Sequence, residues 1–274
     1  MHVDHCRLGE WLETADGLVI TAGAGMGIDS GLPDFRGPGG FWAVYPALGQ
    51  ARIEFTRIAN PAAFASDPTL AWGFYGHRLQ LYRDTIPHPG FDQLLALGQA
   101  LPNGVRVFTS NVDGQFQKAG FSSASICEIH GSIHHLQCID NCKGRIWPAT
   151  EFQPDVDHSA CRLRSNLPRC PDCGALARPN ILMFGDWGWE ERRTACQLQE
   201  LQSWLGNVER LLCIEIGAGE EIPTVRNFSE RHAWRLIRIN PGAPQVPDSQ
   251  RGIGLAMGAL AGLNVLSDAV ASRQ

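Results

Sequence analysis

The sequence lacks the features that assign a chain to a membrane, to secretion or to nucleic acid. Residues 253–266, one of its longest low-charge runs, fall short of the ~18 residues of a membrane span and are interrupted by glycines. Residues 1–17 mix acidic and polar side chains without the apolar core of a secretory signal, which favours the cytoplasm. The 23 basic residues are scattered and the net charge is −5, so we expect no surface that gathers nucleic acid and no membrane partner.

A disulfide framework is also not indicated. The chain has nine cysteines, an odd number, and a reducing compartment is expected, which leaves metal binding, catalysis or simple burial. Its 274 residues, of which 44% are hydrophobic and 19% charged, suffice for one large domain or a main domain with a smaller insertion. We therefore expect a globular protein with a substantial core.

A glycine-rich segment follows the apolar run of residues 17–20, which reads as a buried parallel strand. From Thr21 to Phe41 it is TAGAGMGIDSGLPDFRGPGGF. Residues without a Cβ let backbone N–H groups approach a pyrophosphate, so the pattern predicts a dinucleotide site. The spacing of Gly23, Gly25 and Gly27 lacks the third glycine of the standard fingerprint, and a tight turn is the alternative. The acid, aromatic and base that follow indicate a mobile loop that carries chemistry.

This segment resembles the hallmark of the sirtuins, NAD-dependent protein deacylases, in their bacterial form. Their pattern is GAGxSxxSGIPDFRG, and this chain has GAGMGIDSGLPDFRG. The resemblance extends over roughly residues 17–240 and implies NAD as cofactor. In this segment it implies the following NAD-binding residues: Gly23, Ala24, Gly25, Asp34, Phe35 and Arg36.

Polar residues follow the next predicted strand, residues 105–109. Doubly wound folds place ligand groups at the carboxyl ends of parallel strands, so Asn111 and Asp113 are site candidates, with an Asx turn before a helix as the alternative. The segment TSNVDGQFQKAG is similar to the sirtuin pattern TQNxDxLxxxAG, with Ser110 in place of the glutamine. The resemblance implies that Asn111 and Asp113 serve catalysis and that all three residues bind NAD.

A short strand then delivers His130 to a glycine turn. Histidine titrates near neutral pH and suits a general base, although a structural role is the commoner reading of an isolated His-Gly pair. Sirtuins carry their catalytic histidine in the pattern HG[ST]F, to which residues 130–133, HGSI, are similar. The resemblance implies that His130 takes a proton from a ribose hydroxyl.

The cysteine spacing predicts a structural zinc site. The pairs Cys138-x₃-Cys142 and Cys170-x₂-Cys173 form two short knuckles that can close a tetrahedral thiolate site with no open position for water. The stretch between the two pairs has few apolar residues for a core of its own, so we expect it to need a bound metal ion to fold. Cys161 lies between the pairs as a possible competitor. The other four cysteines are expected in the core: Cys6, Cys127, Cys196 and Cys213.

Two later strands also end in candidate cofactor residues. The strand of residues 208–216 is followed by Gly217, Ala218 and Gly219, where sirtuins have Gly-Thr-Ser. Two hydroxyls that bind NAD in the family are therefore missing, and backbone N–H groups can serve the phosphate instead. The strand of residues 235–239 ends at Asn240, which matches the family's adenosine-ribose position.

The substrate site is expected in two places. Residues 177–186 read as a strand that returns to the main sheet, and their similarity to the sirtuin pattern RPxVVxFGE implies that an acyl peptide binds beside Phe184 and Gly185. Tyr75 and Arg78 share one face of a predicted helix over residues 68–81. This Tyr-x-x-Arg resembles the signature of sirtuins that remove succinyl and malonyl groups. A packed aromatic with an exposed arginine is the alternative, and His88 is expected as a cap or surface residue.

Together these patterns predict an α/β fold, a doubly wound, Rossmann-like parallel sheet with a smaller zinc-ribbon and helical insertion domain. We expect one catalytic unit over residues 1–274, with an NAD-binding domain at 1–132 and 178–274, a zinc ribbon at 133–177 and a helical insertion at 42–90. The implied function is an NAD-dependent protein-lysine deacylase, a transferase that acts on acylated-lysine proteins. Alternatives are a mono-ADP-ribosyltransferase or an NAD glycohydrolase. A non-catalytic NAD-binding module is disfavoured by Asn111, Asp113 and His130.

Overall fold

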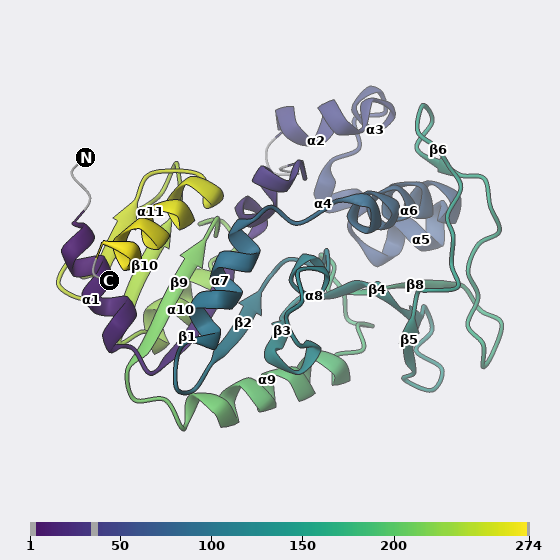
Figure 1. Ribbon diagram of the computed structural model, residues 1–274. Helices are drawn as coiled ribbons and strands as arrows, with labels where there is room; N and C mark the ends of the chain where they lie inside the picture. The colour runs from purple at the N-terminus through teal and green to yellow at the C-terminus, as the bar shows by residue number, and fades with distance from the viewer. Residues whose placement is uncertain (1–3, 34–37, 273–274) are drawn as a thin grey trace.

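The computed structural model describes residues 4–33 and 38–272. Its larger part is a six-stranded parallel sheet with the strand order β11-β10-β9-β1-β2-β3 (Figure 1). The strands are β1 (Gly17–Ala22), β2 (Val105–Thr109), β3 (Ile126–Glu128), β9 (Leu211–Ile216), β10 (Arg235–Ile239) and β11 (Gly252–Leu255). Numbered by their sequence order within the sheet, they follow the doubly wound order 3-2-1-4-5-6. The predicted fold class is confirmed.

Helices cover both faces of this sheet, and each face has its own apolar core. On one face pack α1 (His5–Thr14), α7 (Gly90–Gln99) and α11 (Ala259–Ala271). On the other pack α9 (Arg192–Leu205) and α10 (Thr224–His232). The central strands β1 and β9 are buried along their whole length, as expected of parallel strands covered on both sides. Short segments complete this part: η1 (Ala24–Ser30), α8 (Gln115–Lys118) and η2 (Ser123–Ser125).

A smaller lobe lies beside the sheet and has a third apolar core (Figure 1). Its helices are α2 (Pro38–Val44), α3 (Pro46–Gln50), α4 (Phe55–Ile58), α5 (Pro61–Ser66) and α6 (Pro68–Asp84). Its strands form the antiparallel sheet β5 (Ile146–Pro148), β4 (Gly131–Cys138) and β8 (Ala177–Ile181), and the pair β6 (Val156–Asp157) and β7 (Arg162–Leu163). α6 begins at a strong cap, because the Asp67 carboxylate accepts from the Leu70 N–H and Pro68 takes the first helical position.

The expectation that residues 177–186 return to the main sheet was wrong. β8 pairs antiparallel with β4, so that Cys138 lies opposite Ala177. The chain leaves the main sheet after β3, the short strand at its edge, and continues as β4. The backbone N–H and C=O groups of β8 form their hydrogen bonds with β4, so β8 does not cross back to the edge of the main sheet. Within the described residues, no helix is long and apolar enough to cross a membrane.

Candidate active site

The first cavity lies where the strand order reverses, between β1 and β9. The loops after these strands touch directly: the Gly25 N–H donates to the Gly217 carbonyl at 3.1 Å, and Gly217 has a φ of +61°. A Cβ on Gly217 would come within 2.3 Å of the Gly25 Cα, so both positions require glycine. A cavity of about 270 Å³ opens beside them. Its lining includes Ala24, Gly25, Asp29, Gly217, Ala218, Gly219, Asn240 and Pro241.

Apart from Asp29 and Pro241, these residues are predicted cofactor residues that follow three different strands, and the fold brings them to one cavity. Gly23 lies behind the lining, where its N–H donates to the Ile216 carbonyl at 3.0 Å. Asp34, Phe35 and Arg36 lie outside the described residues. Carboxyl ends of strands at a topological switch point are where doubly wound folds bind nucleotides, and a wall of close-packed glycine backbone suits a pyrophosphate. The cavity therefore fits a dinucleotide.

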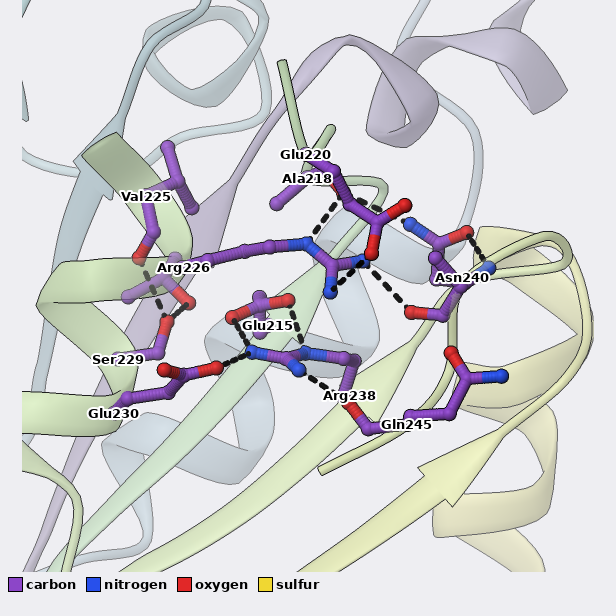
Figure 2. A network of polar contacts seen from close by, with 12 residues as sticks. Glu215, Ala218, Glu220, Val225, Arg226, Ser229, Glu230, Arg238, Asn240 and Gln245 are labelled. Carbon is purple, nitrogen blue, oxygen red and sulfur yellow. Dashed lines mark hydrogen bonds and ion pairs between the residues drawn. The ribbon is translucent and has the colours of Figure 1, made fainter. Parts of the chain in front are cut away.

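Arg226 joins the two walls of this cavity and was missed by the sequence reasoning. It projects from α10 and is only 7% exposed. Its guanidinium donates to the Ala218 carbonyl through Nε (3.2 Å) and to the Ala243 carbonyl through Nη2 (2.7 Å). Figure 2 shows the contact with Ala218. The Asn240 side chain bridges the same walls, because its Nδ2 donates to the Ala218 carbonyl at 2.9 Å and its Oδ1 accepts from the Ala243 N–H. The wall at Ala218 lacks the hydroxyl side chains of the sirtuin pattern, and the hydrogen bonds of Arg226 and Asn240 hold its backbone in place instead.

A buried ion-pair network supports the same region from below (Figure 2). Arg238 on β10 donates to both carboxylate oxygens of Glu215 on β9, at 2.6 and 3.0 Å, and to Glu230 at 2.7 Å. Arg238 and Glu215 are register partners of adjacent strands. Burial opposes the charge on Arg238, but the two carboxylates raise its pKa, so Arg238 keeps its charge. The network fixes β10, and hence Asn240, against β9.

A second cavity of about 350 Å³ adjoins the first, because Ala24 lines both. It combines the predicted catalytic residues with much of the predicted substrate site. Its polar lining comprises Tyr75, Arg78, Tyr82, Ser110, Asn111, Asp113 and His130. Its apolar lining includes Leu32, Phe55, Val112, Ile181, Leu182, Met183, Phe184 and Ile222. Gly185 lines neither cavity.

Asn111 and Asp113 stand at the carboxyl end of β2. The Asn111 Nδ2 donates to the Gly23 carbonyl at 2.9 Å and so ties this strand end to the glycine loop. The Asp113 Oδ1 accepts from the Gln115 N–H at 2.9 Å, so the predicted Asx turn is present in addition to the cavity position. Burial raises the pKa of Asp113 to about 6, against the opposing effect of that N–H donor.

His130 occupies the turn between β3 and β4. The Leu182 N–H donates to its backbone carbonyl at 3.0 Å, and a Cβ on the following Gly131 would lie 2.1 Å from the Asn180 carbonyl. Two residues earlier, Glu128 is held by α9. Thr194 Oγ1 donates to the Glu128 carbonyl, Gln197 Oε1 accepts from the Glu128 N–H, and Arg193 forms an ion pair with the Glu128 carboxylate. The segment from Glu128 to His130 is thus held by α9 at Glu128 and by Leu182 at His130.

The neighbouring histidines have structural places. His134 Nε2 lies 2.8 Å from the Asp113 carbonyl, which can only accept, so this nitrogen donates and links β4 to the β2 loop. Burial lowers the pKa of His135 to about 4, which keeps it neutral at pH 7. His88, expected as a cap or surface residue, is buried at the start of α7. Its Nδ1 accepts from the Gly90 N–H, so its Nε2 donates to the Met26 carbonyl at 3.0 Å and anchors η1.

Arg78 is buried, contrary to the alternative of an exposed arginine. It is 8% exposed, and its Nε and Nη2 donate to the Tyr82 hydroxyl at 3.0 and 2.8 Å. The Tyr75 ring stacks on Phe64 with centroids 5.6 Å apart. Tyr82, one helical turn beyond Arg78, was missed because its only sequence signal is an aromatic residue at helical spacing.

The loop after β8 is held by a buried ion pair. Arg178 donates to both carboxylate oxygens of Asp186, at 2.7 and 2.9 Å, and both side chains are almost fully buried. The Phe184 N–H donates to the Ala59 carbonyl at 3.0 Å, which links this loop to the helices of the smaller lobe. These contacts place Phe184 at the cavity, whereas Trp187 is fully exposed.

The four knuckle cysteines come together as the spacing predicts. The Sγ atoms of Cys138 and Cys173 are 3.7 Å apart, as are those of Cys142 and Cys170, and all four lie within 4.8 Å of one another. A tetrahedron with Zn–S bonds of ~2.3 Å has edges of about 3.8 Å. The cluster therefore fits one zinc ion with four thiolate ligands and no open position, which makes it a structural site.

The other cysteines are outside this cluster. Cys161 is buried in the core of the smaller lobe and does not compete as a ligand. Cys127 and Cys213 are buried, as expected. The expectation for Cys6 and Cys196 was wrong, because both are exposed. They lie on the solvent-facing sides of amphipathic helices, where one cysteine cannot be distinguished from a core residue by composition alone.

Comparisons with known proteins agree with this geometry. Residues 23–215 match the Sir2 family. NAD-dependent protein deacylase 1 of Pseudomonas aeruginosa is 36% identical over 234 residues, which are 85% of this chain and 86% of that protein. The mitochondrial NAD-dependent protein deacylase sirtuin-5 of Danio rerio is 34% identical over 245 residues, 84% of this chain and 74% of that protein. A crystal structure of a Sir2 homologue with NAD has a similar fold, with a TM-score of 0.74 at 23% identity over 100% of this chain and 96% of that one.

Proposed function

On the premise that this chain belongs to the Sir2 family, we propose that it is an NAD-dependent protein-lysine deacylase that releases nicotinamide and O-acyl-ADP-ribose. The observation that carries the proposal is the pair of cavities joined at Ala24. One is lined by glycine loops at the strand switch point, and the other contains Asn111, Asp113 and His130 between apolar walls. A nucleotide and an acyl-lysine side chain could thus meet at the junction of the two cavities.

The residues divide the work by position. Bound NAD would supply the ribose carbon that carries nicotinamide. The acyl oxygen of the modified lysine would form a bond to that carbon while nicotinamide leaves. The glycine loops, Ala218 and Asn240 hold the nucleotide, while Asn111 and Asp113 lie on the nicotinamide side. His130 accepts the proton of a ribose hydroxyl at its imidazole, the side chain most often used as a general base. The apolar walls around Phe184 exclude water from the acyl group.

The test of this proposal is whether nicotinamide release depends on an acylated peptide. Purified protein is incubated with NAD and with unmodified, acetyl-lysine, succinyl-lysine or malonyl-lysine peptides, and nicotinamide, peptide and nucleotide products are measured by mass spectrometry. Release only with acylated peptide, together with O-acyl-ADP-ribose, supports the deacylase. ADP-ribosylated protein would indicate the transferase alternative, and release without any peptide would indicate the glycohydrolase.

We further propose that the acyl pocket accepts groups that end in a carboxylate, because Arg78 is buried at the cavity together with Tyr75. Arg78→Met is then expected to lower kcat/KM for succinyl or malonyl peptides at least about tenfold more than for acetyl peptide, since a charge-assisted contact contributes roughly 1.5–3 kcal/mol. Arg57→Met, at an exposed position of α4, is the matched control. An equal loss on all acyl groups would make Arg78 a structural residue.

The hydrogen bonds of Arg226 lead to a prediction about the cofactor. Arg226→Met removes both contacts to the cavity wall and should raise the KM for NAD about tenfold, with kcat changed much less. Without these contacts the wall is mobile before NAD binds, and the entropy lost when it is ordered weakens binding. The measurement is steady-state kinetics with varied NAD at saturating acyl peptide. Arg231→Met on the exposed side of the same helix is the control. An unchanged KM for NAD would separate Arg226 from cofactor binding.

A further inference from the structure

Tyr82 forms part of the cavity wall next to Arg78. It lies one turn further along α6, is 5% exposed and lines the same cavity as Tyr75, Asp113 and His130. Its backbone carbonyl accepts from the Gln115 Nε2 at 3.0 Å, and the Gln115 N–H in turn donates to Asp113. The position of Tyr82 is therefore fixed relative to the residues at the nicotinamide side.

The hydroxyl of Tyr82 has a defined direction. It accepts two hydrogen bonds from Arg78, at 3.0 Å from Nε and 2.8 Å from Nη2. A guanidinium has donors and no acceptor, so the phenolic hydrogen must point away from Arg78. Among the residues that the structure describes, the Tyr82 hydroxyl makes no other hydrogen bond. The nearby acid Asp113 is engaged by the Gln115 N–H instead. The O–H of Tyr82 is thus available to an occupant of the cavity.

The surroundings select the kind of occupant. The guanidinium of Arg78 lies among the rings of Phe74, Tyr75 and Tyr82, with its Cζ 5.2, 5.8 and 5.4 Å from their centroids. A cation and a hydroxyl donor side by side, flanked by aromatic rings, complement a group that only accepts and is negatively charged. A carboxylate meets both conditions. A methyl group at this place would leave the buried hydroxyl without an acceptor, which disfavours an acetyl chain.

We propose that Tyr82 is a specificity-determining residue for acyl groups that end in a carboxylate, such as succinyl or malonyl. Its oxygen orients the Arg78 guanidinium, and its O–H donates directly to the acyl carboxylate. Tyr82 then acts on the carboxylate together with Arg78, beside the Tyr75 ring that stacks on Phe64. This inference rests on the proposed deacylase function and on the carboxylate pocket.

The first experiment is Tyr82→Phe, which removes one oxygen and keeps the ring beside Arg78. The kcat/KM for a succinyl-lysine peptide should fall at least about tenfold, while that for the acetyl-lysine peptide changes less than about threefold. Tyr45→Phe is the matched control, because it removes a buried hydroxyl from the same lobe, one that bonds His77 Nδ1 at 2.8 Å and does not line the cavity. Its ratio of succinyl to acetyl activity should match the parent. Equal losses on both peptides with Tyr82→Phe would overturn the proposal.

The second experiment separates direct donation from an effect through Arg78. Arg78→Met alone is compared with the double variant Arg78→Met/Tyr82→Phe, neither of which leaves a buried unpaired cation that could prevent folding. A direct donor predicts that the double variant loses at least a further threefold or so on the succinyl peptide. Equal activity of the two variants would refute the direct contact. If the parent protein removes acetyl but not succinyl groups, the inference about Tyr82 fails and the proposed deacylase function stands. If nicotinamide is released without any acyl peptide, the proposed deacylase function itself fails.

Discussion

His130→Ala is expected to lower formation of deacylated peptide by about 10²–10⁴-fold, because it removes the proposed general base. The side chain is partly buried at the cavity, and the contact that its backbone makes with the Leu182 N–H is kept by alanine. The thermal midpoint should therefore stay within a few degrees of the parent. Single-turnover and steady-state product formation, together with a thermal unfolding curve, measure the two quantities.

A matched control is His158→Ala, which removes an exposed imidazole that does not line the cavity. It should keep near-parental turnover. Near-parental turnover of His130→Ala would instead remove its assigned role. Asn111→Ala should also abolish most activity, but it additionally breaks the bond to the Gly23 carbonyl, so the histidine gives the sharper test.

Loss of the zinc site should have the largest effect on folding. Cys138→Ser removes one of four ligands, and the free energy of binding a structural zinc, on the order of 10 kcal/mol, is comparable to the whole stability of a typical domain. The segment between the cysteine pairs has only the short strands β5, β6 and β7 within it. We expect zinc content to fall well below one ion per chain, the ribbon to unfold and deacylation to be lost.

Zinc content by mass spectrometry and thermal unfolding by circular dichroism check this expectation, with Cys196→Ser as control. Cys196 lies exposed on α9, away from the cluster, so the control should retain one zinc ion and the parental midpoint. The loss should reach the active site because Cys138 ends β4, the strand that begins directly after His130. A Cys138→Ser protein that lacks zinc and is still folded and active would contradict a structural role.

Local features of the chain were predictable because each depends on residues close together in the sequence. The glycine loop after β1, the Asn111 and Asp113 pair after β2 and the turn at His130 are strand ends, and a parallel sheet brings strand ends to one edge. The cysteine pairs were equally readable, since two knuckles of fixed spacing can meet around one metal. The fold class followed from the alternation of strands and helices.

Other features depended on packing between distant segments. Arg226 reaches Ala218 and Ala243 only because α10 packs on β9 and β1. The hydrogen bonds between α9 and Glu128 join residues more than sixty positions apart. The strand β8 pairs with β4 because its backbone groups form hydrogen bonds there.

The sequence by itself therefore determined the sheet, the zinc ligands and the strand ends that carry the chemistry, because periodicity and short spacing encode them. The tertiary structure alone decided which long side chains are buried. Arginine and tyrosine can lie at a surface or fold into a core with equal local preference, and only the packing of α6 within the smaller lobe, which buries Arg78 and Tyr82 together, made the choice.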